Sequence, residues 1–439
     1  MALASPFSSI YARAAQPVDL RPRAAAGTTS VEALLEVGGD LKIEEKGKQR
    51  SLPVAVIGKF KYLEHRLNAP GTPPRSLRLY DMAEASIKLD NSTANPVLRE
   101  PLRLVAVRTD DETPFMFSPQ GTLTREELEL IDLPVNTLLV DRLLPEKPVA
   151  VGDTWQNPES LLAGLLGFDL VSQSTATSVI TQIDHDAARI EMSGSVQGAI
   201  CGVTTTMEVK GRYKFSLAER RITWLALLIE EKRSIGPAGP GADVVVRFQF
   251  TVKPGQPRPE FDDDALRRVV MGESTGLDDL EYTTSDGEMK FVHERRWRTL
   301  HAGSEAIAMR LVDRGDLVAQ CNISRLPKVT MNQLPTLARF QEDVRRSLDK
   351  SFGQFVQATE LTTPQGFRLL RVVVQGTAAE LPIQWHYYHL ADGDGHQAVC
   401  AFTLEEQYVQ RFGTLDRDLV ESIRFMDSAS TASLATPAK

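Results

Sequence analysis

The 439-residue sequence has few cysteines, no excess of basic residues and no long run of apolar residues. Its three cysteines, Cys201, Cys321 and Cys400, are too few for a disulfide framework and too scattered for a zinc knuckle. We expect Cys321 and Cys400 to be buried free thiols, and a disulfide between them is the alternative in an exported protein. The formal net charge of −8 argues against a nucleic-acid-binding surface, which requires clustered Lys and Arg. Without about 18 consecutive apolar residues, the sequence predicts no transmembrane span.

The remaining composition, 42% hydrophobic and 25% charged residues, is that of a globular protein of about two or three domains. Its first 27 residues carry only part of an export signal. The segment Ala12-Arg13-Ala14 has the small-x-small form of a signal-peptidase site, whereas a charged start and an apolar core of about 7–15 residues are missing. Residues 1–27 are therefore either the remnant of a signal peptide or a flexible leader. We expect an extracytoplasmic protein, secreted or periplasmic, and a cytoplasmic protein is the alternative.

Residues 28–253 are expected to form an antiparallel β domain with inserted helices. In residues 203–215 apolar and polar residues alternate, which is typical of a sheet with one buried face. Residues 222–229 are apolar on both faces, which predicts a strand covered on both sides. The Gly-Gly-Asp at residues 38–40 is a turn signal.

Three helical segments interrupt this domain. Residues 122–131 begin with threonines that can cap a helix, and residues 133–144 and 161–168 are apolar on nearly all sides, as in buried helices. Between the last two lies LLPEKPVAVGDTW, residues 143–155. Its prolines and glycine predict a structural corner, with Trp155 at the edge of the core.

The rest of the chain differs in kind. A proline-containing and acidic linker, residues 254–285, leads to a second domain, residues 286–426, in which strands surround an amphipathic helix at residues 335–350. Residues 427–439 are rich in Ser, Thr and Ala and are expected to form a disordered tail.

Residues 286–426 resemble the PsbP/Mog1-like family. The resemblance lies in an opening strand that ends near Trp297, the helical sequence FQEDVRRSL at residues 340–348, and a closing strand through Ala401 and Phe402. It implies an α/β/α sandwich with an antiparallel sheet, a role in binding proteins, and no active site.

Residues 28–253 are similar to uncharacterised bacterial exported proteins that share a P-x-x-V-G-D-x-W box. The box residues here are Pro148, Val151, Gly152, Asp153 and Trp155. A long antiparallel sheet with apolar helices also resembles the lipoprotein-carrier half-barrel (LolA-like), although here the helices are inserted midway and a second domain follows. The expected fold class is α+β, with a half-barrel-like sheet followed by a sandwich.

One motif resembles a catalytic serine site. The sequence GESTG at residues 272–276 matches the G-x-S-x-G nucleophile elbow around Ser274, with His293 or His301 and Asp279 as imaginable partners. The elbow requires a strand before it and a helix after it, and neither is expected in the acidic linker. We therefore predict no catalytic residues.

Three further motifs have structural explanations. His386 and His389 are three residues apart, so on a strand they point to opposite faces and cannot share a metal ion. The DGDG at residues 392–395 begins like a calcium loop but lacks its later glycine and glutamate, and is typical of a hairpin turn. Ser347 and Lys350 match S-x-x-K without the companion boxes of serine acylases. We predict no metal site and no cofactor.

The apolar helices over the N-terminal sheet are the one feature that favours a function. They predict a lid over an apolar cavity, with Leu138, Leu139, Leu162, Leu165, Leu166 and Trp224 as candidate ligand-binding residues. The prediction is a non-enzymatic exported protein of the cell envelope that binds a lipid or other apolar molecule. The alternative is a structural or protein-interaction module that contacts an envelope protein and has no small-molecule ligand. An enclosed apolar cavity above about 300 Å³ favours the first, and a filled core favours the second.

Overall fold

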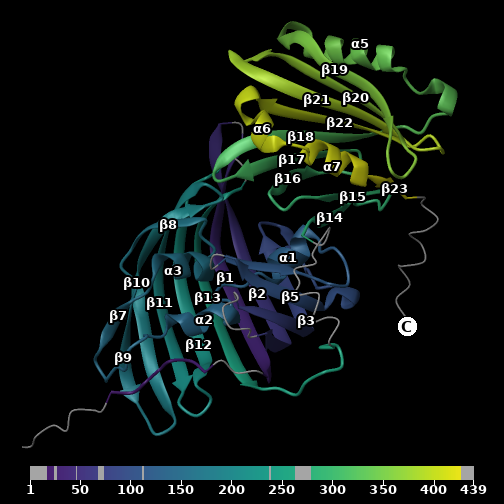
Figure 1. Cartoon of the computed structure of the whole chain (residues 1–439). Helices are drawn as coiled ribbons and strands as arrows, with labels where there is room; N and C mark the ends of the chain where they lie inside the picture. Colours follow the sequence, from purple (N-terminus) through teal and green to yellow (C-terminus); the bar gives the residue numbers. More distant parts are fainter. Residues whose placement is uncertain are drawn as a thin grey trace, which may run out of the picture.

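The computed structural model describes residues 17–23, 27–45, 47–67, 74–110, 113–236, 239–262 and 278–426. The described chain forms two bodies joined end to end, an N-terminal half-barrel (residues 27–254) and a C-terminal sandwich (residues 280–425) (Figure 1). Both are built on antiparallel sheets with a few helices, which confirms the predicted α+β class.

A 13-stranded antiparallel sheet forms the half-barrel and curves around α1, α2 and α3 (Figure 1). Its strand order is β6-β5-β3-β2-β1-β13-β12-β11-β10-β9-β7, with β4 beside β3 and β8 beside β10. The strands are β1 (Gly27–Glu45), β2 (Lys48–Leu67), β3 (Arg75–Leu89), β4 (Ser92–Ala94), β5 (Leu104–Asp110), β6 (Thr113–Phe117), β7 (Thr154–Gln156), β8 (Leu170–Ser174), β9 (Thr177–Ile183), β10 (Ala187–Ile200), β11 (Val203–Ser216), β12 (Arg221–Arg233) and β13 (Gly241–Pro254).

Strand β1 runs straight through Gly38, Gly39 and Asp40, so the turn predicted there is wrong. It pairs with β2 along one side and with β13 along the other, and both ladders continue across this segment. Gly39 has a φ of 147°, and a Cβ at this position would lie 2.3 Å from the carbonyl oxygen of Asp243 on β13. Gly39 therefore permits a close approach of two strands rather than a turn.

The concave face of the sheet carries most of the apolar residues and packs against three short helices. These are α1 (Arg125–Ile131), α2 (Thr137–Val140) and α3 (Glu159–Leu166); α1 and α2 are shorter than the segments that predicted them, whereas α3 is as long as predicted and begins two residues earlier. Short 3₁₀ helices, η1 (Glu100–Leu102) and η2 (Asp141–Leu143), flank them. Thr124 caps α1 in a capping box with Glu127, in agreement with the predicted helix start.

The alternation along β11 and β12 decides which side chains enter the core. Every second residue of β11 from 205 to 215 is buried, which confirms the predicted pattern. On β12, Leu225 is buried, whereas Trp224, Ala226 and Leu228 lie on the outer face and remain partly exposed. The predicted cover over both faces of this strand is thus not found among the described residues.

The sandwich contains a seven-stranded antiparallel sheet in the order β16-β17-β18-β22-β21-β20-β19. Helix α5 packs on one face against β19 and β20, and α6 and α7 lie on the other (Figure 1). Its strands and helices are β16 (Trp297–Ala302), β17 (Ala306–Asp313), β18 (Asp316–Leu326), β19 (Phe352–Thr362), β20 (Arg368–Ala378), β21 (Leu381–Ala391), β22 (Gln397–Glu405), α5 (Leu337–Leu348), α6 (Val409–Phe412) and α7 (Leu415–Ser422). The short 3₁₀ helices are η3 (Met331–Gln333), η4 (Asp349–Ser351) and η5 (Glu406–Tyr408). Among the described helices of the whole chain, none has the length and apolarity needed to cross a membrane.

A small sheet connects the two bodies. It consists of β14 (Leu280–Thr283), β15 (Met289–His293) and β23 (Arg424–Phe425), so the described end of the predicted linker pairs with the sandwich. The backbone N–H of Glu281 donates to the carbonyl oxygen of Leu123, just before α1, at 2.9 Å. Helix α1 is therefore one contact between the half-barrel and the sandwich, and Gly202 in the β10–β11 turn lies against Gly315 of the sandwich at another.

Part of the predicted leader is packed against the half-barrel. Val18 forms an isolated bridge with Val149, and Leu20 is fully buried in the main core. Three predicted segments lie outside the described residues in part or in whole. They are residues 1–16 and 24–26 of the leader, residues 263–277 of the linker, and the predicted disordered tail at residues 427–439.

Candidate ligand-binding site

An apolar cavity of about 560 Å³ lies between the concave face of the half-barrel and α1. Its floor comes from β1, β2 and β3, through Leu35, Val56, Phe60, Ala85 and Ile87. Leu130 of α1 and Val97, which follows β4, form the walls. Val97 is 58% exposed, so the cavity opens to solvent beside it. The volume exceeds about 300 Å³ and the lining is mainly apolar, as for a small apolar ligand, but the cavity is open on one side and not enclosed as expected.

An ion pair fixes the rim of this cavity. Arg99 donates from Nε to Oε1 of Glu127 at 2.6 Å and from Nη2 to Oε2 at 2.7 Å. The same carboxylate accepts from the backbone N–H of Thr124 at 2.9 Å. Burial raises the pKa of Glu127, but the hydrogen bonds from Arg99 and from the backbone outweigh burial and hold the pKa below its usual range. Since Arg99 follows β4 and Glu127 lies on α1, the pair ties the two walls together.

The ligand-binding residues predicted from the sequence lie elsewhere. Leu138, Leu139, Leu162, Leu165 and Leu166 are each at most 8% exposed and pack together in the main core under α2 and α3. Trp224 lies on the outer face of β12, on the opposite side of the sheet from the core. The structure therefore brings the five leucines together and separates them from Trp224.

Sequence reasoning missed the residues that do line the cavity. Leu35 and Val56 follow the ordinary alternation of a strand with one apolar face, as in any half-buried sheet. Nothing in that alternation indicates which part of the apolar face the helices leave uncovered. The location of the cavity depends on where α1 meets the sheet.

A buried ion network holds α2 against the sheet, and no sequence motif indicated it. Glu64 on β2 is fully buried, and its Oε1 accepts from Arg78 Nε at 2.9 Å and from Thr137 Oγ1 at 2.8 Å. Arg66 donates from Nε to Glu64 Oε2 at 3.2 Å and from Nη1 to Asp141 Oδ2 at 2.8 Å. Burial raises the pKa of Glu64, but Arg78, Arg66 and the hydrogen bonds outweigh it and bring the pKa to about 2.

The P-x-x-V-G-D-x-W box is a corner, as predicted. Gly152 has a φ of 93°, and Asp153 Oδ2 accepts from the backbone N–H of Ala150 at 2.8 Å. Trp155 lies partly buried on the short edge strand β7, where its Nε1 donates to the carbonyl oxygen of Leu143 at 2.8 Å. The tryptophan therefore ties the edge of the sheet to the end of η2.

His386 and His389 lie on opposite faces of β21, which confirms the directions predicted from their spacing. His386 Nδ1 lies 2.6 Å from Asp416 Oδ2 on α7, and Tyr388 donates to the same carboxylate oxygen at 2.5 Å. The ring of His389 faces Phe340 of α5, with centroids 5.8 Å apart. Burial lowers the pKa of His389. The two histidines therefore take part in the packing of different helix layers.

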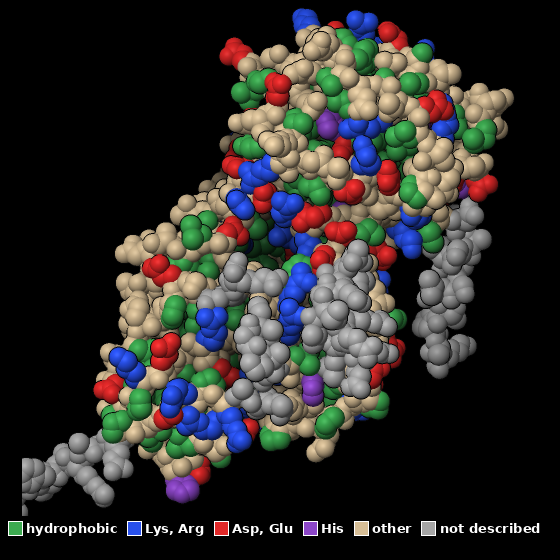
Figure 2. Space-filling model, viewed as in Figure 1, with side chains coloured by type: hydrophobic (Ala, Val, Ile, Leu, Met, Phe, Trp, Pro, Cys, Tyr) green, Lys and Arg blue, Asp and Glu red, His purple; other side chains and the backbone are tan. Residues whose placement is uncertain are grey.

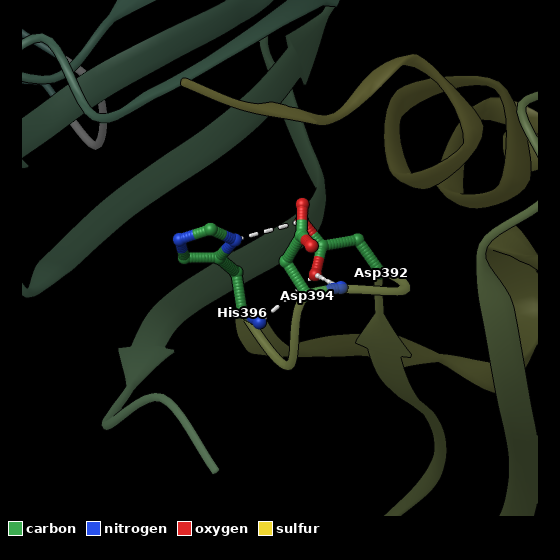
Figure 3. Close-up of side chains that lie close together, drawn as sticks. All are labelled: Asp392, Asp394 and His396. Carbon is green, nitrogen blue, oxygen red and sulfur yellow. Dashed lines mark hydrogen bonds and ion pairs between the residues drawn. The ribbon is translucent and has the colours of Figure 1, made fainter. Parts of the chain in front are cut away.

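The DGDG segment forms the hairpin turn between β21 and β22 (Figure 3). Asp392 Oδ1 accepts from the backbone N–H groups of Asp394 and His396, both at 2.9 Å, and Oδ2 lies 2.8 Å from His396 Nδ1. The Nζ atom of Lys328 lies 3.4 Å from the other ring nitrogen of His396. The carboxylate of Asp392 thus holds the turn, in agreement with the prediction.

The remaining candidate groups are a serine motif in the linker, a serine on α5 and two thiols. Ser274, on which the nucleophile-elbow hypothesis depends, lies outside the described residues. Ser347 donates from Oγ to the carbonyl oxygen of Val344 at 2.8 Å, which ties it to its own helix. Cys321 and Cys400 are free and fully buried, as expected, and burial raises the pKa of Cys400 to about 12.

No family model matches the sequence, and no curated protein matches it. Among solved structures, a Mog1 variant is 10% identical over 35% of this chain and 99% of its own, with a TM-score of 0.28. CyanoP, the PsbP of Synechocystis sp. PCC 6803, is 15% identical over 34% of this chain and 93% of its own, with a TM-score of 0.26.

A third structural neighbour is lipovitellin, in a structure that concerns its lipid–protein interactions. It is 10% identical over 54% of this chain, with a TM-score of 0.31, and this chain spans only 26% of its length. The neighbours thus include the PsbP and Mog1 folds at low coverage and identity. Likenesses at this level say nothing of what the present chain binds.

Proposed function

We propose that this chain is a non-enzymatic binding protein of the cell envelope whose half-barrel takes up an apolar ligand, such as the acyl chain of a lipid. The observation that carries the proposal is the cavity of about 560 Å³ on the concave face, with Phe60 and Ala85 in its floor and Leu130 in its wall. Ligand pockets usually measure about 300–1,000 Å³ and combine a mainly apolar lining with a few fixed polar groups. The Arg99–Glu127 pair supplies such fixed groups at the rim.

A second candidate is a structural or protein-interaction module without a small-molecule ligand. It is favoured by the packing under α2 and α3, where the leucines predicted to line a cavity fill the core instead. In that case the sandwich contacts a partner protein of the envelope, and the half-barrel serves as its support.

The non-enzymatic part of the proposal is supported by the hydrogen bonds of two residues that belong to catalytic or metal-like motifs in the sequence. Ser347 donates to a carbonyl of its own helix, and Asp392 accepts from the backbone and contacts the His396 ring of its own turn. Export is supported by the Ala12-Arg13-Ala14 site in the sequence. Fractionation of the source cells tests it: the protein is expected outside the cytoplasm, and its recovery with cytoplasmic markers overturns this part.

Native mass spectrometry combined with a cavity-filling variant tests ligand binding. The protein is purified from a lipid-containing host, and a bound mass that denaturation releases as an apolar molecule is expected. Ala85→Phe places a phenyl ring in the cavity floor and is expected to abolish the bound mass. Ala55→Phe is the matched control, because Ala55 is exposed on the outer face of the neighbouring strand β2.

The outcomes separate the two candidates. A bound mass in the wild type and in Ala55→Phe, but not in Ala85→Phe, supports the apolar ligand. A bare polypeptide mass in all three, with no uptake of a fluorescent fatty acid added afterwards, overturns the ligand and favours the interaction module. A bound mass in all three proteins would show that the ligand binds to another part of the molecule.

A further inference from the structure

A second cavity, of about 700 Å³, lies between the half-barrel and the sandwich on the other side of α1. Its walls come from β6 and α1, from the turn between β10 and β11, and from the residues around β16 and the β17–β18 turn. Basic and acidic side chains gather at this junction between the two bodies (Figure 2). The arginines that line it are Arg125, Arg233, Arg295, Arg296, Arg298 and Arg314. The acidic residues are Glu129, Asp132, Asp169 and Asp313, so cations outnumber carboxylates.

Much of the negative charge in the cavity is already engaged. Asp313 lies 3.3 Å from Arg296 and 2.6 Å from Arg411, which approaches from α6. Asp169 accepts from the backbone N–H of Gly202 at 2.8 Å. These contacts engage two of the four carboxylates of the cavity, whereas Asp278, Asp279 and Glu294 lie close enough to Arg295 to raise its pKa against the larger effect of burial.

Glu129 is shared between two arginines. Its Oε1 lies 3.2 Å from Arg298 Nη1 and 3.9 Å from Arg125 Nε. The side chain of Glu129 is 61% exposed, which weakens both interactions through solvent screening. One carboxylate at the rim therefore faces two guanidinium groups.

One donor atom each of Arg125 and Arg295 is directed at neutral carbonyl groups. Arg125 Nη2 donates to the carbonyl oxygens of Arg295 and Trp297, and Arg295 Nε donates to the carbonyl oxygen of Asp278. The guanidinium of Arg295 lies 4.0 Å from the ring centroid of Phe115. Its Nη2 is buried without a hydrogen-bond partner among the described residues. Burial and the neighbouring arginines lower the pKa values of both Arg125 and Arg295 to about 10.

We propose that this cavity binds the phosphate group of a ligand, held by Arg125, Arg295 and Arg298. A phosphate carries the acceptors that the unpartnered Nη2 of Arg295 lacks, and its geometry matches the paired N–H groups of a guanidinium. A buried donor without an acceptor is unfavourable, and an oxyanion in the cavity supplies an acceptor to Nη2 of Arg295 next to the two other arginines. The three arginines do not line the apolar cavity, although Glu129 borders both cavities, and the proposal does not depend on the proposed function.

The phosphate has two sources with the same chemistry, a water-soluble phosphate ester or the headgroup of an anionic phospholipid. Titration calorimetry of the full chain with inorganic phosphate and with glycerol 3-phosphate at low salt tests the first. Flotation with vesicles of phosphatidylglycerol, compared with phosphatidylcholine, tests the second. Binding is expected in at least one arm and is expected to weaken as salt is raised. Absence of binding in every arm overturns the site.

Two substitutions with opposite expected effects distinguish an anion site from a structural contact. Arg295→Gln is expected to weaken binding about 10-fold or more, because charge-assisted hydrogen bonds are lost. Glu129→Gln is expected to strengthen binding a few-fold, because the carboxylate that competes for Arg125 and Arg298 is removed. Arg339→Gln is the matched control, since Arg339 lies exposed on α5, on the opposite face of the sandwich sheet from α6 and α7.

The unfolding temperature of each variant without ligand shows whether it is folded. If Arg295→Gln does not fold, Arg298→Gln replaces it, with the same expected loss. Equal affinity in the wild type and in the arginine variant overturns the proposal. If Arg339→Gln weakens phosphate binding as much as Arg295→Gln does, the binding is a non-specific attraction to the charged surface. That result also overturns the proposal. Uptake of the apolar ligand is expected to be unchanged in Arg295→Gln. If phosphate binding is not found, the proposed function of the half-barrel is therefore unaffected.

Discussion

Replacing Glu64 with glutamine tests whether the buried ion network stabilises the half-barrel. The pKa of Glu64 lies near 2 in the folded protein, against an ordinary value of 4.5. At about 1.4 kcal/mol for each tenfold difference in proton affinity, the ionised carboxylate contributes about 3 kcal/mol to the free energy of unfolding. Glu64→Gln removes that charge and leaves Arg78, which is 3% exposed, without its carboxylate partner. Loss of one partner from a buried pair typically costs about 3–5 kcal/mol.

The effect has a defined dependence on pH. Because the folded pKa is depressed, the stabilisation is fully present above pH 4.5 and is lost as the pH falls toward 2. The difference between wild type and Glu64→Gln is therefore expected to be about 3 kcal/mol at pH 7 and only about 1 kcal/mol at pH 3. Glu208→Gln, on the exposed face of β11, is the matched control, with an expected change within about 0.5 kcal/mol.

The free energy of unfolding is measured in urea by hydrogen exchange of peptides from β2 and β3. This measures the stability of the half-barrel separately from that of the sandwich, whereas a single unfolding signal from the whole chain combines the two. A cost below about 1 kcal/mol at pH 7 would refute the assigned network. A cost of the same size at pH 3 and pH 7 would refute the assigned role of the ionised carboxylate.

The remaining predictions concern two positions of the half-barrel, each with a matched control and each measured as the urea midpoint of the same peptides. Gly39→Ala is expected to lower the free energy of unfolding by at least about 2 kcal/mol, because the backbone conformation of Gly39 and the nearby Asp243 oxygen exclude a Cβ. Gly38→Ala is the control: a Cβ at Gly38 meets no atom within 4 Å, and this change is expected to be nearly neutral. Similar costs for the two glycines would contradict this reasoning. Trp155→Phe is expected to cost about 1 kcal/mol through loss of its hydrogen bond to the η2 carbonyl, and Trp224→Phe on the outer face is expected to cost less. A greater loss of stability in Trp224→Phe than in Trp155→Phe would contradict the assignment of Trp224 to the outer face.

Several features of the fold could be predicted because their causes are local. The alternation of β11 buries every second side chain, and the Thr124–Glu127 capping box begins α1 where the sequence predicts a helix. The opposite directions of His386 and His389 follow from strand geometry alone. Each of these depends on residues a few positions apart, so the sequence contains the whole signal.

Features that depend on pairing between distant strands could not be predicted. The Gly-Gly-Asp at residues 38–40 reads as a turn until β13, about 200 residues later, pairs along it and makes Gly39 a point of close approach. Trp224 belongs to an apolar run, and only the register of β12 against its neighbours turns it to the outer face. The same holds for Glu64, whose partners lie on β3 and at α2.

The sequence by itself determined the antiparallel β class, the capped start of α1, the corner at Trp155 and the opposite directions of His386 and His389, since these follow from spacing within one element. Only the tertiary structure decided that the predicted leucines fill the core and that the apolar cavity lies beside α1. It also decided that arginines from both bodies meet in one cavity. The physical reason is that a cavity is set by what curvature and packing leave uncovered, and side-chain alternation is the same whether a face is covered or open.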